Sequence, residues 1–206
     1  DDHQGVRVIL ADGLLLCFGL GLVLAALVLW SQPLLANMGQ PTEVVDSAQS
    51  YLFWVGLSLV PLVGFQGFKQ FAEGLFQTQL SMYATLLGNV INVVLNYLLI
   101  FGMHGFPELG IEGAAIGTLI ARWSMVLFMV IGVINKKSFK RYYHKIFSVK
   151  LRKSLFKNIF SLGLPSALQM FFEVTFFTTA IWMSGLLGKN PQAANQIALN
   201  LSTMTY

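Results

Sequence analysis

The chain has 206 residues, of which 55% are hydrophobic and 11% charged, and its formal net charge at pH 7 is +4. This composition excludes an ordinary soluble domain, because the apolar residues stand in long runs and lack an amphipathic spacing. A bilayer core about 30 Å thick needs roughly 20 apolar helical residues to cross it, and a helix satisfies its own backbone polar groups there. We therefore predict an all-α, polytopic transmembrane helix bundle.

The apolar runs predict six membrane-spanning helices. In chain order they are Gly13 to Trp30, Tyr51 to Phe68, Met82 to Met103, Gly113 to Ile134, Ile159 to Leu187, and a span that begins near Gln192 and is still running at Tyr206. Cys17 is the single cysteine and lies in the first span, so we expect it to serve packing, with no disulfide framework or cysteine metal site. The chain does not begin with Met, and Asp1 to Gln4 are typical of a polar loop, so we expect a truncated piece of a larger protein.

Basic residues are concentrated in one connection. Nine of the thirteen Lys and Arg residues stand between Asn135 and Asn158. Because cytoplasmic loops carry an excess of Lys and Arg, this segment is predicted to be a cytoplasmic connector, and the alternation of spans then places Arg7 and Lys69 at cytoplasmic ends.

The connector also has a helical pattern of its own. One apolar face is formed by Phe139, Tyr142, Tyr143, Ile146 and Phe147. This spacing predicts an amphipathic helix in the headgroup region, with its cations toward anionic membrane lipids. A nucleic-acid interface, which basic and aromatic residues also favour, does not suit a segment that joins membrane spans.

Glu173 is the most informative charge within a predicted span. It lies fourteen residues from each end of Ile159 to Leu187, which places it near the midplane. A charge there costs several kcal/mol and persists mainly where it is buried or wet, so we predict a carboxylate that holds either a proton or Na⁺. Gln169, one turn earlier, offers a further oxygen ligand. The alternative is structural, with Glu173 in a buried hydrogen bond or in a salt bridge to Arg122, although the long stem of Arg122 favours a reach to a polar interface.

The third and fourth predicted spans carry polar and small residues at helical spacing. Asn89, Asn92 and Asn96 form an amide-rich face that must point inward, either to coordinate Na⁺ or a protonated acid or to join helices. The fourth span opens with a small residue at every fourth position, and these residues, Gly113, Gly117 and Ala121, predict close helix packing.

Sequence motifs for other functions are absent. The chain has no Gly-rich Walker loop, no His-Glu-x-x-His and no Gly-x-Ser-x-Gly, and its three histidines lie in loops, so we do not expect an enzyme or a bound cofactor. A channel would need a repeated filter or a ring of charges, and neither is visible.

Four short motifs, in this order and spacing, resemble a known family. They are Asn92-Val93-Val94-Leu95-Asn96-Tyr97, then Leu109-Gly110-Ile111-Glu112-Gly113-Ala114-Ala115, then Gly163-Leu164-Pro165-Ser166 with Phe172-Glu173-Val174 after it, and Ala194-Asn195-Gln196-Ile197-Ala198-Leu199-Asn200. The chain resembles the multidrug and toxic compound extrusion (MATE) transporters, and in particular their NorM-like branch. The resemblance runs over nearly the whole chain.

The resemblance implies twelve spans in two six-helix lobes in the plasma (inner) membrane, of which this chain is similar to the third to the eighth. Residues 1–134 would then belong to the N-terminal lobe with four helices, residues 135–158 to the connector, and residues 159–206 to the start of the C-terminal lobe with two helices, the last incomplete. Members of the family exchange Na⁺ or H⁺ for organic, often cationic, drugs or toxins by alternating access, and they need no other cofactor and no obligate protein partner.

The resemblance also implies roles for individual residues. Glu173 falls on the family's cation-site glutamate of the seventh span, where Na⁺ is the candidate metal, and Asn92 and Asn96 fall on the polar pair of the fifth span that faces an acid of the first. That acid and the tenth-span acid are not in this sequence. Residues expected to line the substrate cavity are Gln169, Phe177, Asn195, Gln196 and Asn200. The alternative functions are a flippase for lipid-linked oligosaccharides or their precursors, which would have a more cationic cavity, and a non-transporting membrane scaffold.

Overall fold

The computed structural model describes residues 3–36, 42–135, 153–186 and 195–201, and its described residues are helical apart from short turns. The helices are α1 (His3–Ala36), α2 (Thr42–Gly74), α3 (Thr78–Phe101), the 3₁₀ turn η1 (Met103–Gly105), α4 (Gly110–Asn135) and α6 (Lys153–Leu186). Two compact units divide the chain, Asp1–Arg152 and Lys153–Tyr206. The predicted all-α architecture is therefore confirmed, whereas the assignment of residues to two lobes stays a prediction.

Five of these helices are long and apolar enough to cross a membrane. The candidate spans are Val8–Pro33, Val45–Gly74, Thr78–Phe101, Gly110–Asn135 and Lys157–Ser184. They coincide with the first five predicted spans, but several extend further, because a helix continues through polar residues that a count of uncharged positions leaves out. For the sixth predicted span the structure describes residues 195–201, which are helical. The predicted amphipathic helix of the connector lies outside the described residues.

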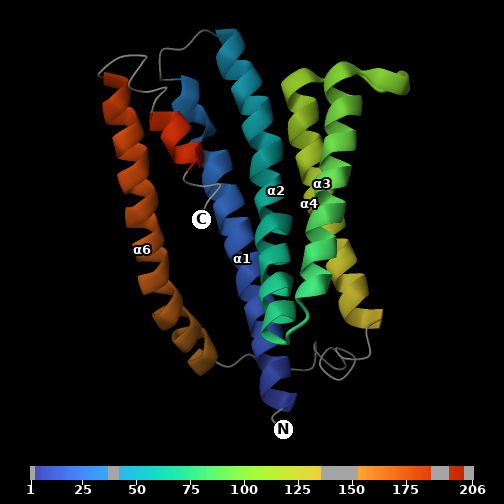
Figure 1. Ribbon diagram of the computed structural model, residues 1–206, viewed down its shortest axis with the longest axis vertical. Helices are drawn as coiled ribbons and strands as arrows, with labels where there is room; N and C mark the ends of the chain where they lie inside the picture. Colours follow the sequence, from blue (N-terminus) through green and yellow to red (C-terminus); the bar gives the residue numbers. More distant parts are fainter. Residues whose placement is uncertain (1–2, 37–41, 136–152, 187–194, 202–206) are drawn as a thin grey trace. The chain divides into compact units, whose positions relative to one another are not determined.

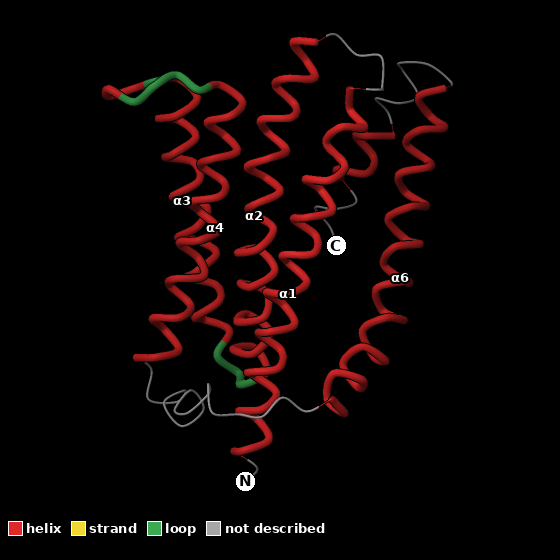
Figure 2. Tube along the Cα trace, turned by 180° about the vertical axis from the view of Figure 1, so that it is seen from behind, coloured by secondary structure: helices red, strands yellow, loops and turns green. Residues whose placement is uncertain are grey.

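The first unit is a bundle of four antiparallel helices in which α2 is the shared element. It packs against α1 on one side and against α4 on the other, and α4 packs in turn against α3 (Figure 1). Seen from behind, the same order holds (Figure 2). The start of α1, the end of α2, the start of α3 and the end of α4 therefore lie at one end of the bundle, while η1 lies at the other.

The hydrophobic core of this unit lies toward the end where a short turn joins α2 to α3. Its buried members come from three helices, and they are Phe65, Phe68 and Ala72 of α2, Leu80 and Ala84 of α3, and Val126, Met129 and Val133 of α4. The members of each helix recur at three- and four-residue intervals, which places them on one face. Leu14 and Phe18 of α1 pack against this cluster from the α1 side of α2.

Glycines set the closest approaches between helices. A Cβ atom at Gly113 of α4 would lie 2.6 Å from the carbonyl oxygen of Leu99 on α3, and one at Gly64 of α2 would lie 2.6 Å from the ring of Phe18 on α1. Gly113, Gly117 and Ala121 are all buried. The prediction that these small residues serve close packing is confirmed.

The second unit is described by itself. Its main helix, α6, contains Pro165 and exposes its side chains continuously over residues 160–180. Aromatic side chains form neighbouring pairs along it, with ring centroids 6.0 Å apart for Phe171 and Phe172 and 5.9 Å apart for Phe176 and Phe177.

Candidate functional site

The two asparagines predicted as a pair lie in one hydrogen-bonded network between α3 and α4. Asn92 Nδ2 donates to Thr118 Oγ1 at 3.2 Å, and Asn96 Nδ2 donates to Asn92 Oδ1 at 3.1 Å. Thr118 in turn donates to the carbonyl oxygen of Ala114, one turn earlier on α4, at 2.9 Å. The amides therefore join two helices, which is one of the two roles that the sequence left open. Asn89 is exposed and does not take part, so only part of the predicted amide face points inward.

One hydrogen-bond acceptor of this network lacks a donor among the described residues. Asn96 Oδ1 is buried and has no hydrogen-bond donor among the described residues. It faces Gly117, where a Cβ atom would lie 2.7 Å from it, so the glycine makes room for the amide. A buried acceptor without a donor costs roughly 1–3 kcal/mol, so the network has the capacity to accept one further proton donor or to bind a cation.

Arg122 of α4 turns toward α2. Its Nη1 donates to Ser58 Oγ, and Ser58, which is fully buried, donates to the carbonyl oxygen of Val55 at 2.7 Å. This differs from the favoured expectation of a side chain that reaches a polar interface, because a hydroxyl on the adjacent helix lies within reach of the guanidinium. In a bundle interior a charged hydrogen bond of this kind is stronger than one in water.

A second link between α2 and α4 lies nearer the η1 end of the bundle. Trp54 Nε1 donates to Glu112 Oε1 at 2.8 Å. Glu112 stands in the first turn of α4, where the helix dipole stabilises a negative charge. The two links fix α4 against α2 at two levels along their length.

Asp12 is an acid that the sequence reasoning missed. It lies within the candidate span of α1 and its exposed fraction is 0%. The predicted first span began at Gly13, immediately after it. The signal that could have found Asp12 is the position of a carboxylate inside a helix that the apolar pattern extends on both sides.

The predicted site residues of the second unit fall into two groups. Gln169, Glu173 and Phe177 stand at intervals of four along α6, and all three are exposed. Gln169 and Glu173 therefore share one helix face, as predicted, and Phe177 lies on the same face. In the helical segment 195–201, Asn195 Nδ2 donates to Ser184 Oγ at 3.4 Å, and Gln196 and Asn200 are exposed. The structure thus brings Asn92 together with Asn96, whereas Gln169, Glu173 and Phe177 stand exposed at successive turns of α6.

Comparisons with known proteins find one family model and relatives that cover the whole chain. The family model MatE matches residues 1–98. A probable multidrug resistance protein NorM from Oceanobacillus iheyensis is 33% identical over 209 residues, which cover 100% of this chain and 46% of the relative. Another with the same description, from Idiomarina loihiensis, is 30% identical over 217 residues, with 100% of this chain and 45% of the relative covered. The chain is therefore similar to MATE-family proteins over its whole length. It spans somewhat less than half the length of these curated relatives.

A solved structure supports the same fold. It is described as the inward-facing conformation of a multidrug resistance MATE family transporter of the MOP superfamily, and it matches 81% of this chain and 37% of its own with a TM-score of 0.71 and 24% identity. With five helices able to cross a membrane among the described residues, and with these relatives, the chain is a multi-pass membrane protein.

Proposed function

We propose that the full-length protein containing this chain is a secondary-active multidrug efflux transporter of the plasma membrane, which exchanges Na⁺ or H⁺ for organic, often cationic, compounds by alternating access. The match to the MatE family model and the relatives described as probable multidrug resistance proteins support this proposal. Apolar spans that hold a few polar groups at helix interfaces are typical of transporters, whose ion and substrate sites lie within the membrane.

The observation that carries the proposal is the buried acceptor of the α3–α4 network. Asn96 Oδ1 is the group that would gain a partner when a proton donor or Na⁺ arrives, and Asn92 holds the Asn96 amide in place. A ligand shifts a conformational equilibrium only by its differential affinity for the two states. An acceptor that has a partner in one state and none in the other supplies such a difference.

Glu173 is proposed as the second coupling group, on α6. The carboxylate alternates between a cation-bound and a cation-free state, with Gln169 as an additional oxygen ligand for Na⁺. Phe177 on the same face offers an aromatic surface to an organic cation. Asn195, Gln196 and Asn200 are proposed to line the substrate path. The extent of each lobe and the cytoplasmic position of the basic connector 135–158 belong to the same proposal.

The test replaces one charge in the full-length protein. Glu173→Gln keeps the shape of the side chain and removes its charge, and we expect it to abolish ion-driven efflux of a fluorescent cationic dye from everted vesicles while membrane insertion is unchanged. Glu108→Gln, in the loop before α4, is the matched control and should retain efflux. Retained ion-coupled efflux in Glu173→Gln would refute the role of this acid.

The same vesicles distinguish the ion and the alternative functions. A Na⁺ gradient and a H⁺ gradient are imposed separately, and the gradient that drives dye movement identifies the coupling ion. Dye movement that depends on neither gradient would contradict antiport. A scaffold would show no efflux in the unaltered protein, and a flippase would move a lipid-linked oligosaccharide in place of the dye.

A further inference from the structure

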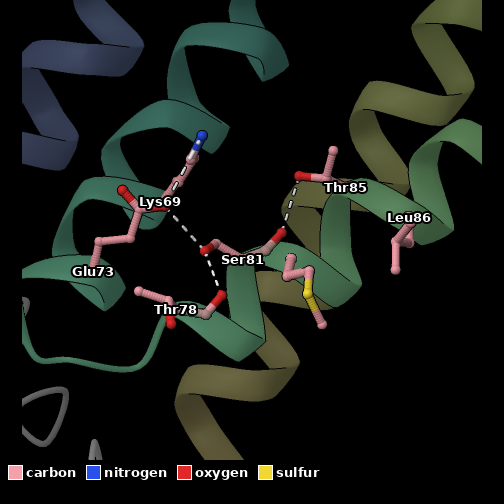
Figure 3. A pocket seen from close by; sticks show the side chains of 7 residues that line it. Lys69, Glu73, Thr78, Ser81, Thr85 and Leu86 are labelled. Carbon is pink, nitrogen blue, oxygen red and sulfur yellow. Dashed lines mark hydrogen bonds and ion pairs between the residues drawn. The ribbon is translucent and has the colours of Figure 1, made fainter. Parts of the chain in front are cut away.

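A pocket of about 370 Å³ lies at the turn between α2 and α3, and none of the proposed coupling or substrate residues lines it. Lys69 and Glu73 line it from the last turns of α2, and the hydroxyl residues Thr78, Ser81 and Thr85 line it from the first turns of α3 (Figure 3). The volume is within the range of small-molecule sites, roughly 300–1,000 Å³. One wall therefore carries a charge of each sign, and the other carries hydroxyl groups.

The two charges of the pocket are only loosely paired. Lys69 Nζ lies 3.9 Å from Glu73 Oε1, which is an ion pair but longer than a hydrogen bond, and the side chains are 36% and 33% exposed. A lysine that precedes a glutamate by four residues is also the weaker order for such a pair on a helix. Partly exposed pairs contribute little to stability, so a ligand with complementary charges displaces this one at small cost.

Ser81 positions the carboxylate of Glu73. Its hydroxyl lies 3.2 Å from Glu73 Oε1 and 2.8 Å from the carbonyl oxygen of Thr78, and both are acceptors for its single proton. Both contacts that Glu73 makes within the described residues use Oε1, which leaves the second carboxylate oxygen for a ligand cation. Glu73 is thus oriented by Ser81, with one carboxylate oxygen left for a ligand.

Lys69 is the group of the pocket that favours an anion, since it is the one cation among the residues that line it. Glu73, one turn later on α2, favours a cation, and its carboxylate lies 3.9 Å from the Lys69 ammonium. The pocket therefore offers an anion subsite and a cation subsite at adjacent positions.

The pocket also opens onto an apolar surface at headgroup depth. The candidate span of α2 ends at Gly74 and that of α3 begins at Thr78, so the polar wall lies at the end of two membrane spans. Met82 and Leu86 complete the lining, stand one turn apart on α3, and are 49% and 53% exposed. They continue from the polar wall along the side of a span, where acyl chains lie.

We propose that this pocket binds the headgroup of a phospholipid that carries both a phosphodiester and a primary ammonium group. The phosphate is bound by Lys69, the ammonium donates to Glu73, and the acyl chains lie against Met82 and Leu86. A primary ammonium donates hydrogen bonds to a carboxylate, whereas a choline group has no N–H to donate. The pocket therefore selects ethanolamine lipids over choline lipids by hydrogen bonding.

The test measures lipid binding to the full-length protein, purified and delipidated, by native mass spectrometry. Phosphatidylethanolamine, phosphatidylcholine and phosphatidylglycerol with the same acyl chains are titrated separately. We expect the ethanolamine lipid to bind roughly three- to tenfold more tightly than the choline lipid, which corresponds to one hydrogen bond to a charged group in a partly exposed site. Equal affinities in the unaltered protein would refute the proposal.

Matched variants assign the preference to the pocket. Glu73→Gln should reduce the ethanolamine-to-choline ratio to about one, and Glu108→Gln, the same change in an exposed loop, should leave it intact. Lys69→Met should weaken the binding of all three lipids, and Lys157→Met, at an exposed position of α6, should not. A preference that persists in Glu73→Gln would place the selective group elsewhere.

Two further arms separate a lipid from a soluble ligand and from a folding defect. Glycerophosphoethanolamine and inorganic phosphate share the headgroup chemistry but lack acyl chains, and each should compete much less well than the lipid. Competition at equal concentration would overturn the assignment to a lipid. Glu73→Asp keeps the charge and should retain the preference, so its loss there would contradict the role of the carboxylate. The readout is binding, so it does not depend on transport.

Discussion

A methyl group added at Gly113 should push α4 away from α3. In Gly113→Ala the new Cβ atom would lie 2.6 Å from the carbonyl oxygen of Leu99, about 0.8 Å closer than the 3.4 Å at which ordinary contact begins. The obstacle is backbone and cannot rotate aside, and the same carbonyl accepts a hydrogen bond from the Leu109 N–H at 2.9 Å. Overpacking of this kind costs about 1–3 kcal/mol.

The displacement also reaches the polar network. If α4 moves away from α3 by most of this distance of about 0.8 Å, the 3.2 Å hydrogen bond from Asn92 to Thr118 lengthens toward about 4 Å. At that distance it is lost, at a cost of about 1 kcal/mol. The better helix propensity of alanine offsets about 0.5–1 kcal/mol. We therefore expect Gly113→Ala to lower the free energy of unfolding by about 1–3 kcal/mol.

The assay is the thermal loss of the monodisperse peak of full-length protein in a mild detergent, followed by size-exclusion chromatography. The matched control is Gly19→Ala, because Gly19 lies inside α1 and a Cβ atom there would meet nothing within 4 Å. The control should melt at or slightly above the unaltered protein, whereas Gly113→Ala should melt several degrees below it. Equal midpoints for the two variants would refute the reasoning from close approach.

Three further predictions use the same melting assay. Thr118→Val keeps the side-chain shape but removes the acceptor of Asn92, and should lower stability by about 1–2 kcal/mol, whereas Thr118→Ser should not; equal effects would contradict the hydrogen bond. Trp54→Phe and Glu112→Leu each remove the same hydrogen bond between α2 and α4. The double variant should therefore lose no more stability than about the larger of the two single losses, and additive losses would disprove the pairing. Phe76 is 92% exposed at a φ of 57°, so Phe76→Asn should raise stability by up to about 1 kcal/mol, and an unchanged midpoint would argue against backbone strain.

The helices could be predicted from the sequence because crossing a bilayer requires a long apolar run, and within the bilayer a single run satisfies its backbone hydrogen bonds only as a helix. Their ends could not, since a helix continues past the hydrocarbon for as long as its backbone bonds are satisfied. α6 begins at Lys153, six residues before the predicted span, and α1 includes Asp12. Asp12 was missed because it lies at the edge of the uncharged run, while its burial depends on the helices packed around it.

Polar contacts between helices were less predictable than apolar ones, for a physical reason that the two sides of α2 illustrate. Toward α1 the closest approaches are at small residues, such as Gly64 against Phe18, and the glycines that allow them are visible in the sequence. Toward α4 the contacts include directional hydrogen bonds, such as Arg122 to Ser58, and the sequence of either helix does not indicate which residue of the other it will bond. Spacing within one helix reveals which face is small or polar. Which helix that face meets, and therefore whether Arg122 reaches water or a hydroxyl, is decided only when the bundle assembles.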